Sequence, residues 1–353
     1  MTSAPRWVAS IALGAVALVS CAMIGPGGTS AQPAEIYAAG PTVSDVRALF
    51  GDDNWWQGPP SFQVRPLDAE TTSFTQRFSV AQRFLRIGTA EEFVVQYTVF
   101  DKTSSATTRM TGLQQALGAS PSSPKVGDQV LYYGLPGSGG APYITRTFVR
   151  VGQIVVSIIW ARKDPTTTVQ QLGRIAVKVV GGLKKATSAR VRETPAPVDQ
   201  KLLPPPGLDI TFLGAAPLSV EAWLVMVNIG IPTAGLKLLH DAGVTDFAYG
   251  DYALNNDTHM EVRSALLTFA TATAAADWAS TWSSGTPDQS NIASAYVPTA
   301  GVEGSGEYHY FFTAGTFGGM LVCKSSIEGE AASRACEGPM ERTAIGWKFA
   351  LGG

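Results

Sequence analysis

Residues 143–160 have the sequence YITRTFVRVGQIVVSIIW, and they indicate the fold more clearly than any other stretch of the chain. Two runs rich in β-branched and aromatic residues flank Gly152, as the strands of a β-hairpin flank their turn. Residues 308–323, YHYFFTAGTFGGMLVC, repeat this arrangement around Gly315. The two stretches predict matching antiparallel hairpins, one in each half of the chain.

Strand and helix patterns in the same order surround both hairpins. Phe93–Val99 alternates like a half-buried strand, and apolar residues before and after the first hairpin recur at spacings of three and four, as on amphipathic helices. In the second half, a strand at Val262–Phe269 precedes a helix and the hairpin, and a closing helix starts at Pro339. We predict an α+β fold of two similar modules, each an antiparallel sheet covered by amphipathic helices. The likeness has two explanations, an ancient duplication or the coincidence of a common pattern.

Composition divides the chain into segments. An apolar run at Trp7–Val19 has the length of a signal-peptide core and is shorter than the roughly 20 residues that span a bilayer as a helix. Small residues and prolines without apolar periodicity follow it, and a second proline-rich stretch lies near the middle of the chain. The predicted organisation is a signal peptide at 1–20, a flexible tether at 21–41, module 1 at 42–186, a linker at 187–207 and module 2 at 208–353.

The three cysteines fit an exported protein. Leu18–Cys21 ends the apolar run and resembles the bacterial lipobox, in which the cysteine becomes the lipidated N-terminus. The alternative is simple secretion, with cleavage after Thr29–Ala31. If Cys21 carries lipid, Cys323 and Cys336 remain as an even pair that an oxidising envelope allows to bond, and their spacing matches no redox or zinc motif. We therefore predict lipidation at Cys21 and a disulfide between the other two cysteines.

Together, these features resemble exported actinobacterial cell-envelope lipoproteins and extracytoplasmic sensor domains. The resemblance rests on Leu18–Cys21, the tether, an alanine- and threonine-rich α+β body, and the Cys323 and Cys336 pair between the last strand and the last helix. It implies a protein outside the cytoplasm that its N-terminal lipid holds at the membrane, or one that is secreted. It implies a location more than an activity.

The charge balance and the absence of catalytic motifs exclude several classes of function. The 353 residues include 26 lysines and arginines and 28 aspartates and glutamates, with a net charge of -2 and no basic run, which argues against nucleic-acid binding. No serine nucleophile elbow, phosphate-binding loop or zinc-protease motif occurs. His240, His259 and His309 are scattered, so a hydrolase would need a site that only the fold assembles. We predict no catalytic residue, no metal site and no cofactor.

Carboxylates and large aromatic residues gather in GDDNWWQGPP at residues 51–60. Such residues either stack on and hydrogen-bond a sugar ring or fill the edge of a core. Tryptophans at helical spacing near residue 280 either line an apolar cleft or pack in a core. The candidate ligand contacts are Asp52, Asp53, Trp55, Trp56, Trp278 and Trp282. The predicted function is a non-enzymatic binding or interaction module for an envelope protein, a lipid or a glycan; the alternative is a carrier or sensor of a lipid or glycan.

Overall fold

The computed structural model describes most of the chain beyond residue 30. The described residues are 31–63, 76–89, 91–118, 125–135, 143–162, 169–188, 198–226, 232–257, 259–283, 292–298, 306–325 and 334–352. The predicted signal peptide at 1–20 and the predicted lipidation site, Cys21, lie outside them. Within the described part, no helix is both long enough and apolar enough to cross a membrane.

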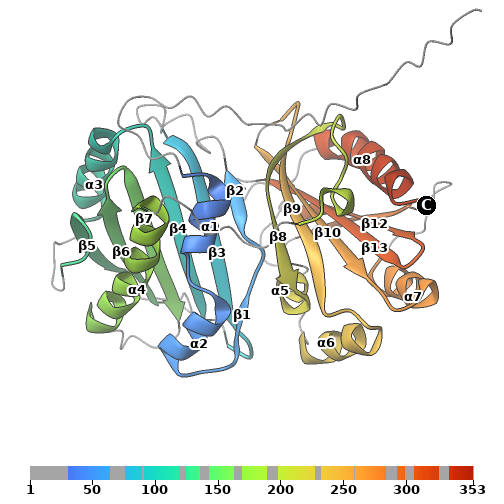
Figure 1. The fold of residues 1–353 in the computed structure, drawn as a ribbon, viewed down its shortest axis with the longest axis horizontal. Helices are drawn as coiled ribbons and strands as arrows, with labels where there is room; N and C mark the ends of the chain where they lie inside the picture. The colour runs from blue at the N-terminus through green and yellow to red at the C-terminus, as the bar shows by residue number, and fades with distance from the viewer. Residues whose placement is uncertain are drawn as a thin grey trace, which may run out of the picture.

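The first half of the chain forms sheet A and its helices (Figure 1). In chain order, the elements are α1 (Pro33–Ala39), α2 (Val43–Phe50), β1 (Trp55–Gln57), β2 (Ser61–Gln63), β3 (Gln76–Arg86), β4 (Glu92–Phe100), α3 (Thr103–Leu117), β5 (Gln129–Leu135), β6 (Tyr143–Val151), β7 (Ile154–Arg162) and α4 (Val169–Ser188). The strand order is β1-β3-β4-β7-β6-β5, and β2 also pairs with β3. The hairpin predicted around Gly152 is β6–β7, and this glycine has the positive φ, 58°, that L side chains disfavour.

The second half forms sheet B. Its elements are η2 (Gln200–Leu202), β8 (Ile210–Ser219), α5 (Val220–Met226), α6 (Pro232–Asp241), β9 (Asp246–Leu254), β10 (Met260–Thr268), α7 (Ala272–Trp282), β11 (Ile292–Pro298), β12 (Gly306–Ala314), β13 (Phe317–Ser325), η3 (Arg334–Cys336) and α8 (Glu337–Ala350). The strand order is β8-β9-β10-β13-β12-β11. The predicted disulfide is confirmed: Cys323 in β13 is bonded to Cys336, the last residue of η3 before α8, with their Cα atoms 6.2 Å apart.

The two sheets share one topology. Starting from β1 in sheet A and β8 in sheet B, the strands follow each other in the same spatial order. Helices α3 and α7 occupy the same place in the chain order, before β5 and β11, and α4 and α8 follow the last strand of each sheet. The predicted α+β fold with two similar modules is therefore confirmed, and the likeness extends to strands β8 and β9, which the sequence patterns did not predict.

Alternation along the central strands divides each sheet into two faces. In β4, Val95, Tyr97 and Val99 are buried in a core with α1, α2 and α4. The residues between them, Gln96 and Thr98, point to the opposite face, where α3 packs at one end in a smaller apolar cluster. Antiparallel pairing of β4 with β3 and β7 carries this division across the sheet.

The tether predicted at residues 21–41 was too long. Residues 33–39 instead form α1, which packs against α4 and β3. Pro33 opens the helix, Gln32 and Glu35 form a capping box, and Ile36 is buried in the core of sheet A. Two turns of helix offer too few positions for an apolar period to stand out in a proline- and alanine-rich segment. Part of the predicted linker is also packed, since Leu203 is buried in a core of sheet B.

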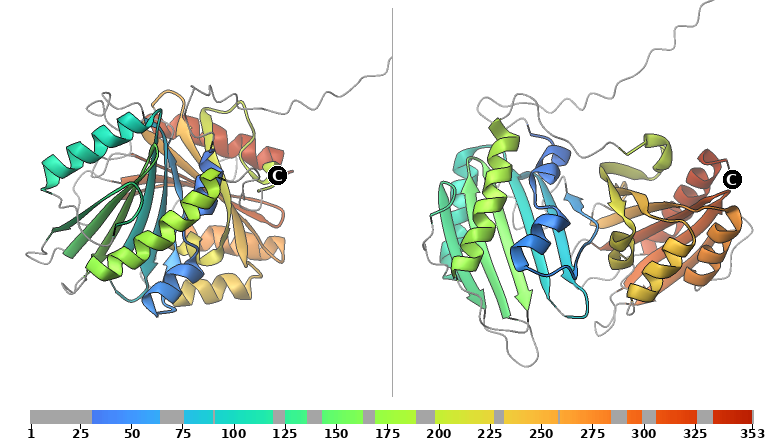
Figure 2. Two further views of the ribbon diagram at one scale, coloured as in Figure 1. Left: turned by 60° about the vertical axis from the view of Figure 1, so that its left-hand side comes forward. Right: turned by 60° about the horizontal axis from the view of Figure 1, so that its bottom comes forward.

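The β1–β2 edge of sheet A lies beside sheet B (Figures 1 and 2). Strand β1 contacts α5, and β2 contacts β8 and β9. Neighbouring residues of β1 enter different cores: Trp55, 1% exposed, packs in the core of sheet A, and Trp56, 9% exposed, packs in a core of sheet B. A strand with side chains on alternate sides thus joins the two modules.

Candidate functional site

The face of sheet A that carries α3 is hollowed into a groove of about 440 Å³, which we call the amide groove. Its polar lining consists of three amides, three hydroxyls and two guanidinium groups, from Gln63, Gln76, Gln96, Ser79, Thr98, Ser157, Arg109 and Arg146. Cross-strand pairing gathers them, because Gln96 pairs with Ser157 and Thr98 with Ser79. Leucines of α3 and aromatic residues of β4 and β6 form an apolar wall beside them.

The equivalent face of sheet B is filled. Helix α7 covers one end of that face, as α3 does in module 1, and α5 and α6 pack beside it. Module 1 covers the other end: the Phe62 N–H donates to Asp251 at 2.6 Å, and the Tyr249 hydroxyl donates to the Pro60 carbonyl at 2.8 Å. In the described part of module 1, α3 is the one helix on this face. The groove therefore occupies a place that other parts of the chain fill in module 2.

A second hollow, of about 360 Å³, lies on the opposite face of sheet A, where β3 and β7 end beside α2 and α4; we call it the arginine pocket. Its lining is Leu49, Phe50, Gly51, Asp52, Trp55, Arg86, Glu91, Trp160, Arg162, Gln171, Arg174 and Ile175. Arg86 binds both carboxylates, with Nε 2.5 Å from Asp52 Oδ2 and Nη1 2.9 Å from Glu91 Oε2. A backbone hydrogen bond from Asn54, aided by Arg86, lowers the pKa of Asp52 below its ordinary value.

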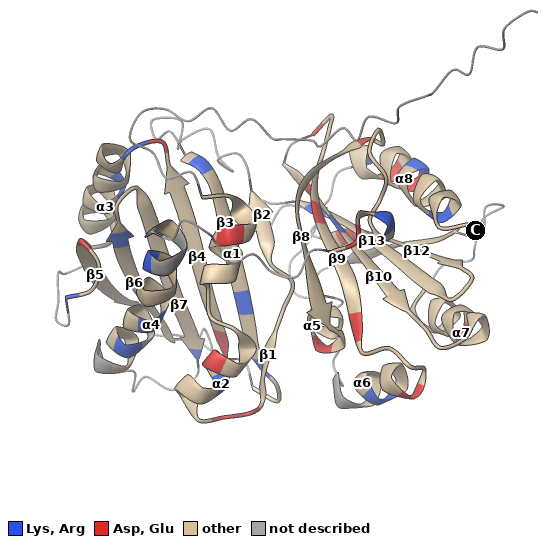
Figure 3. Ribbon diagram, in the orientation of Figure 1, with Lys and Arg blue, Asp and Glu red and all other residues tan. Residues whose placement is uncertain are grey.

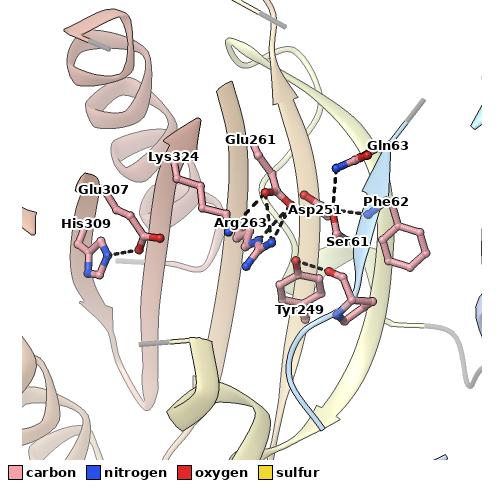
Figure 4. A network of polar contacts seen from close by, with 11 residues as sticks. Ser61, Phe62, Gln63, Tyr249, Asp251, Glu261, Arg263, Glu307, His309 and Lys324 are labelled. Atoms are coloured by element: carbon pink, nitrogen blue, oxygen red, sulfur yellow. Dashed lines mark hydrogen bonds and ion pairs between the residues drawn. The ribbon is translucent and has the colours of Figure 1, made fainter. Parts of the chain in front are cut away.

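Charged side chains form a network on sheet B, at its contact with β2 (Figure 4). Arg263 donates to both oxygens of Glu261, at 3.0 and 3.1 Å, and Lys324 Nζ lies 3.7 Å from the same carboxylate. Ser61 of module 1 donates to Glu261 Oε1 at 3.2 Å. Beyond Lys324, His309 Nε2 lies 3.0 Å from Glu307 Oε2. The network pairs these charges and ties β2 to sheet B.

Two buried carboxyl groups of the network have pKa values shifted in opposite directions. Burial, with a further contribution from Glu261, raises the pKa of Asp251 well above its ordinary 3.8. Burial acts in the same sense on Glu261, but Arg263 and Lys324 outweigh it and lower the pKa of Glu261 to about 2. Burial thus favours the protonated form of Asp251, whereas Arg263 and Lys324 favour the carboxylate form of Glu261.

The structure brings some of the predicted ligand contacts together and separates others. Asp52 and Trp55 line the arginine pocket, whereas Trp56 lies on the other side of β1 in a core of sheet B. Asp53 is exposed and lines neither hollow. Trp278 and Trp282 of α7 pack against Trp223, with ring centroids 5.9 and 4.8 Å apart. This tryptophan cluster belongs to the core beneath α5 and α7.

The three histidines lie apart in the fold. His240 is in α6, His259 precedes β10, and His309 belongs to the charge network. Among the described residues, no group of three or more histidine, cysteine, aspartate or glutamate side chains could hold a metal ion. Basic and acidic residues are interspersed over both modules (Figure 3).

The sequence patterns did not predict the amide groove. Gln96 and Thr98 alternate with buried residues as on any strand with one face in water, so their pattern alone did not mark a site. The location of these residues in the sheet is the signal that could have indicated a site. Gln96, Thr98 and Ser157 lie on β4 and β7, which are the central strands of sheet A.

No protein-family model and no curated protein matches this chain. Among solved structures, the extracellular domain of PknH from Mycobacterium tuberculosis is similar, with 13% sequence identity and a TM-score of 0.37, over 45% of this chain and 100% of that one. A TM-score of this size does not establish a shared fold. The function proposed below therefore rests on the residues of this chain.

Proposed function

We propose that this chain is an exported, non-enzymatic binding protein that its N-terminal lipid anchors to the membrane, and that the amide groove of module 1 holds its ligand. One observation carries the proposal. The two modules share a topology, yet the face that α5 and module 1 cover in module 2 is covered in module 1, as far as the described residues go, by α3, with a groove of about 440 Å³ beside it. That volume lies within the range of small-molecule sites.

The lining favours a hydroxyl-rich ligand with an apolar side. Amides and hydroxyls both donate and accept hydrogen bonds, as the hydroxyl groups of a sugar require. The adjoining wall, with Phe100, Phe148 and Leu113, offers apolar surface to the other side of such a ligand. A glycan or a glycolipid headgroup has this combination, and it occurs in the cell envelope where the lipobox-like Leu18–Cys21 would deliver the protein.

The same lining favours binding over catalysis. General acid–base catalysis needs a side chain that exchanges a proton near the working pH, in contact with the reacting group. The described residues that line the groove include no carboxylate, histidine or cysteine. Its guanidinium groups keep their protons, and its amides do not titrate.

Ligand binding tests the groove. Native mass spectrometry of the protein purified from its own envelope identifies a bound ligand, and calorimetry with that compound compares variants. Gln96→Leu removes one amide at nearly constant volume and should weaken binding about 5- to 100-fold, because a ligand group loses its partner. Gln115→Leu, on the exposed side of α3, is the matched control and should bind as the wild type does. Equal binding by both variants, or no compound retained by the wild type, would refute the proposal.

Metabolic labelling tests the anchor. Cells fed a tagged fatty acid should label the wild-type protein and should leave Cys21→Ala unlabelled. An unlabelled wild type would favour simple secretion, and equal labelling of the variant would place the lipid on another residue.

A further inference from the structure

We propose that the ligand of the amide groove carries a negative charge, as a carboxylate or phosphate group on a sugar, and that Arg109 and Arg146 bind this group. The inference rests on the proposed function of the groove and adds the chemical class of its ligand. It starts from the charge of the lining, which contains these two guanidinium groups and, among the described residues, no carboxylate. An anionic group on the ligand would neutralise the charge that the described lining leaves unbalanced.

The pairing of the arginines in module 1 is the first argument. Arg83, Arg86 and Arg150 each form an ion pair with a carboxylate. Arg109 and Arg146 form none within the part of the chain that the structure describes. Both side chains are half-buried, and the attraction between charges grows as surrounding water is replaced by protein. An anion that enters the groove therefore gains more from these two guanidinium groups than from an exposed arginine.

The position of Arg146 beside the polar residues of the groove is the second argument. Gln96 of β4 pairs with Ser157 of β7, and Ser157 pairs with Phe148 of β6. Arg146 lies two residues from Phe148 on the same strand, so both side chains lie on the groove face, about 7 Å apart along β6. A sugar that binds Gln96 and Ser157 through its hydroxyls therefore has a guanidinium within reach of a charged substituent.

The setting of each guanidinium is the third argument. Arg146 Nε is buried and has no hydrogen-bond partner among the described residues, so packing rather than a polar contact holds this side chain in place. On α3, Arg109, Gly112 and Ala116 recur at spacings of three and four and line the groove together. A Cβ at Gly112 would meet no atom within 4 Å, so small residues leave space beside Arg109. The N–H donors of a guanidinium match the oxygens of a carboxylate or a phosphate.

Calorimetry with three sugars at neutral pH tests the inference on the whole protein. Glucose 1-phosphate and glucuronate carry an anionic group, and glucose is the neutral counterpart. At least one anion should bind about 10-fold or more tightly than glucose, and the preferred anion distinguishes a sugar phosphate from a sugar acid. Equal Kd values for the three sugars would overturn the inference and leave the groove as a site for neutral sugars. Binding of neither anion would also overturn it, and the native mass spectrometry described above would still decide whether the groove holds a ligand.

Matched variants locate the anionic group. Arg109→Gln keeps a good helix former in α3 and should weaken binding of the anion about 10-fold or more while changing the Kd of glucose less than twofold. Arg146→Gln should act in the same way. Arg174→Gln removes an exposed arginine of α4, on the opposite face of sheet A, and should leave both Kd values unchanged. Equal Kd values of the anion for Arg109→Gln and Arg174→Gln would refute the inference.

Two further variants separate this inference from the proposed function. Gln96→Leu should weaken binding of the anion and of glucose alike, because it removes a contact to the shared sugar ring. Gly112→Leu favours the helix and extends a side chain into the open space of the groove, so it should block all three sugars. If these two variants weaken binding and the arginine variants do not, the groove is the ligand site and the anionic class is wrong.

Discussion

Replacing Asp251 with asparagine should flatten the pH dependence of stability. Asp251 is 0% exposed, its Oδ2 accepts the Phe62 N–H at 2.6 Å, and its Oδ1 has no hydrogen-bond partner among the described residues. Burial raises its pKa well above 3.8, so the folded protein retains a proton that the unfolded chain releases. The asparagine side chain has nearly the same shape, stays neutral at every pH and keeps an oxygen for Phe62.

The sign and size of the effect follow from proton linkage. For a carboxyl whose pKa is raised by folding, the stability contribution is fully present below pH 3.8 and is lost as the pH rises toward the folded pKa. The loss is about 1.4 kcal/mol for each pH unit through which the folded carboxyl keeps its proton. Relative to the wild type, Asp251→Asn should therefore gain stability as the pH rises from about 4 toward the folded pKa of Asp251.

Urea unfolding followed by tryptophan fluorescence at pH 4, 5, 6 and 7 measures this difference. A constant difference across the series, or a variant less stable than the wild type at pH 7, would show that Asp251 is ionised and paired with Arg263, and would refute the reasoning. Glu261→Gln is the control, and its difference from the wild type should stay nearly constant between pH 5 and 7. Because the pKa of Glu261 is lowered from 4.5 to about 2, its contribution of about 3 kcal/mol is present above pH 4.5 and is lost as the pH falls through 2.

Three sets of substitutions test other parts of the fold by chemical denaturation. Replacing Cys323 and Cys336 with alanine should lower the free energy of unfolding by about 3 kcal/mol, and reducing agent should then have no further effect on the variant, whereas it destabilises the wild type. Trp56→Ala should cost about 3–5 kcal/mol and expose the junction between modules to limited proteolysis; an unchanged digestion pattern would contradict its place in the core of sheet B. Gly214→Ala would bring a Cβ to 2.6 Å from the Phe62 ring and should lower the free energy of unfolding by about 1–3 kcal/mol. Adding Phe62→Ala should remove this clash, so the double variant should lose less stability than the two single variants together. Strictly additive losses would argue against the clash.

The elements with strong periodicity were predictable from the sequence. The hairpins around Gly152 and Gly315 combine apolar strands with a turn glycine, and α4 repeats apolar residues over about four turns, from Val169 to Leu183. Strands β8 and β9 escaped prediction because their sequences include Gly214, Pro217 and Gly250, which strand propensities disfavour. Gly214 is required by the close approach of the Phe62 ring, and Pro217 is tolerated because β8 is an edge strand of sheet B; only the tertiary structure provides either setting.

The candidate sites were predictable only in part. The sequence picked out Asp52 and Trp55, which do line a pocket, because acids and tryptophans stand together there. It could not supply Arg86, Arg162 or Arg174, since three separate elements bring them to the pocket. Contacts between residues far apart in sequence depend on the pairing of strands, and no local pattern encodes them.

The opposite burial of Trp55 and Trp56 has a mechanical consequence. A hinge motion that separated the modules would have to remove the side chain of Trp55 or of Trp56 from its core. Exposing that apolar area costs about 25 cal/mol of free energy per Å². The chain is therefore expected to tumble as a single rigid body. A partner that binds either module would therefore orient both.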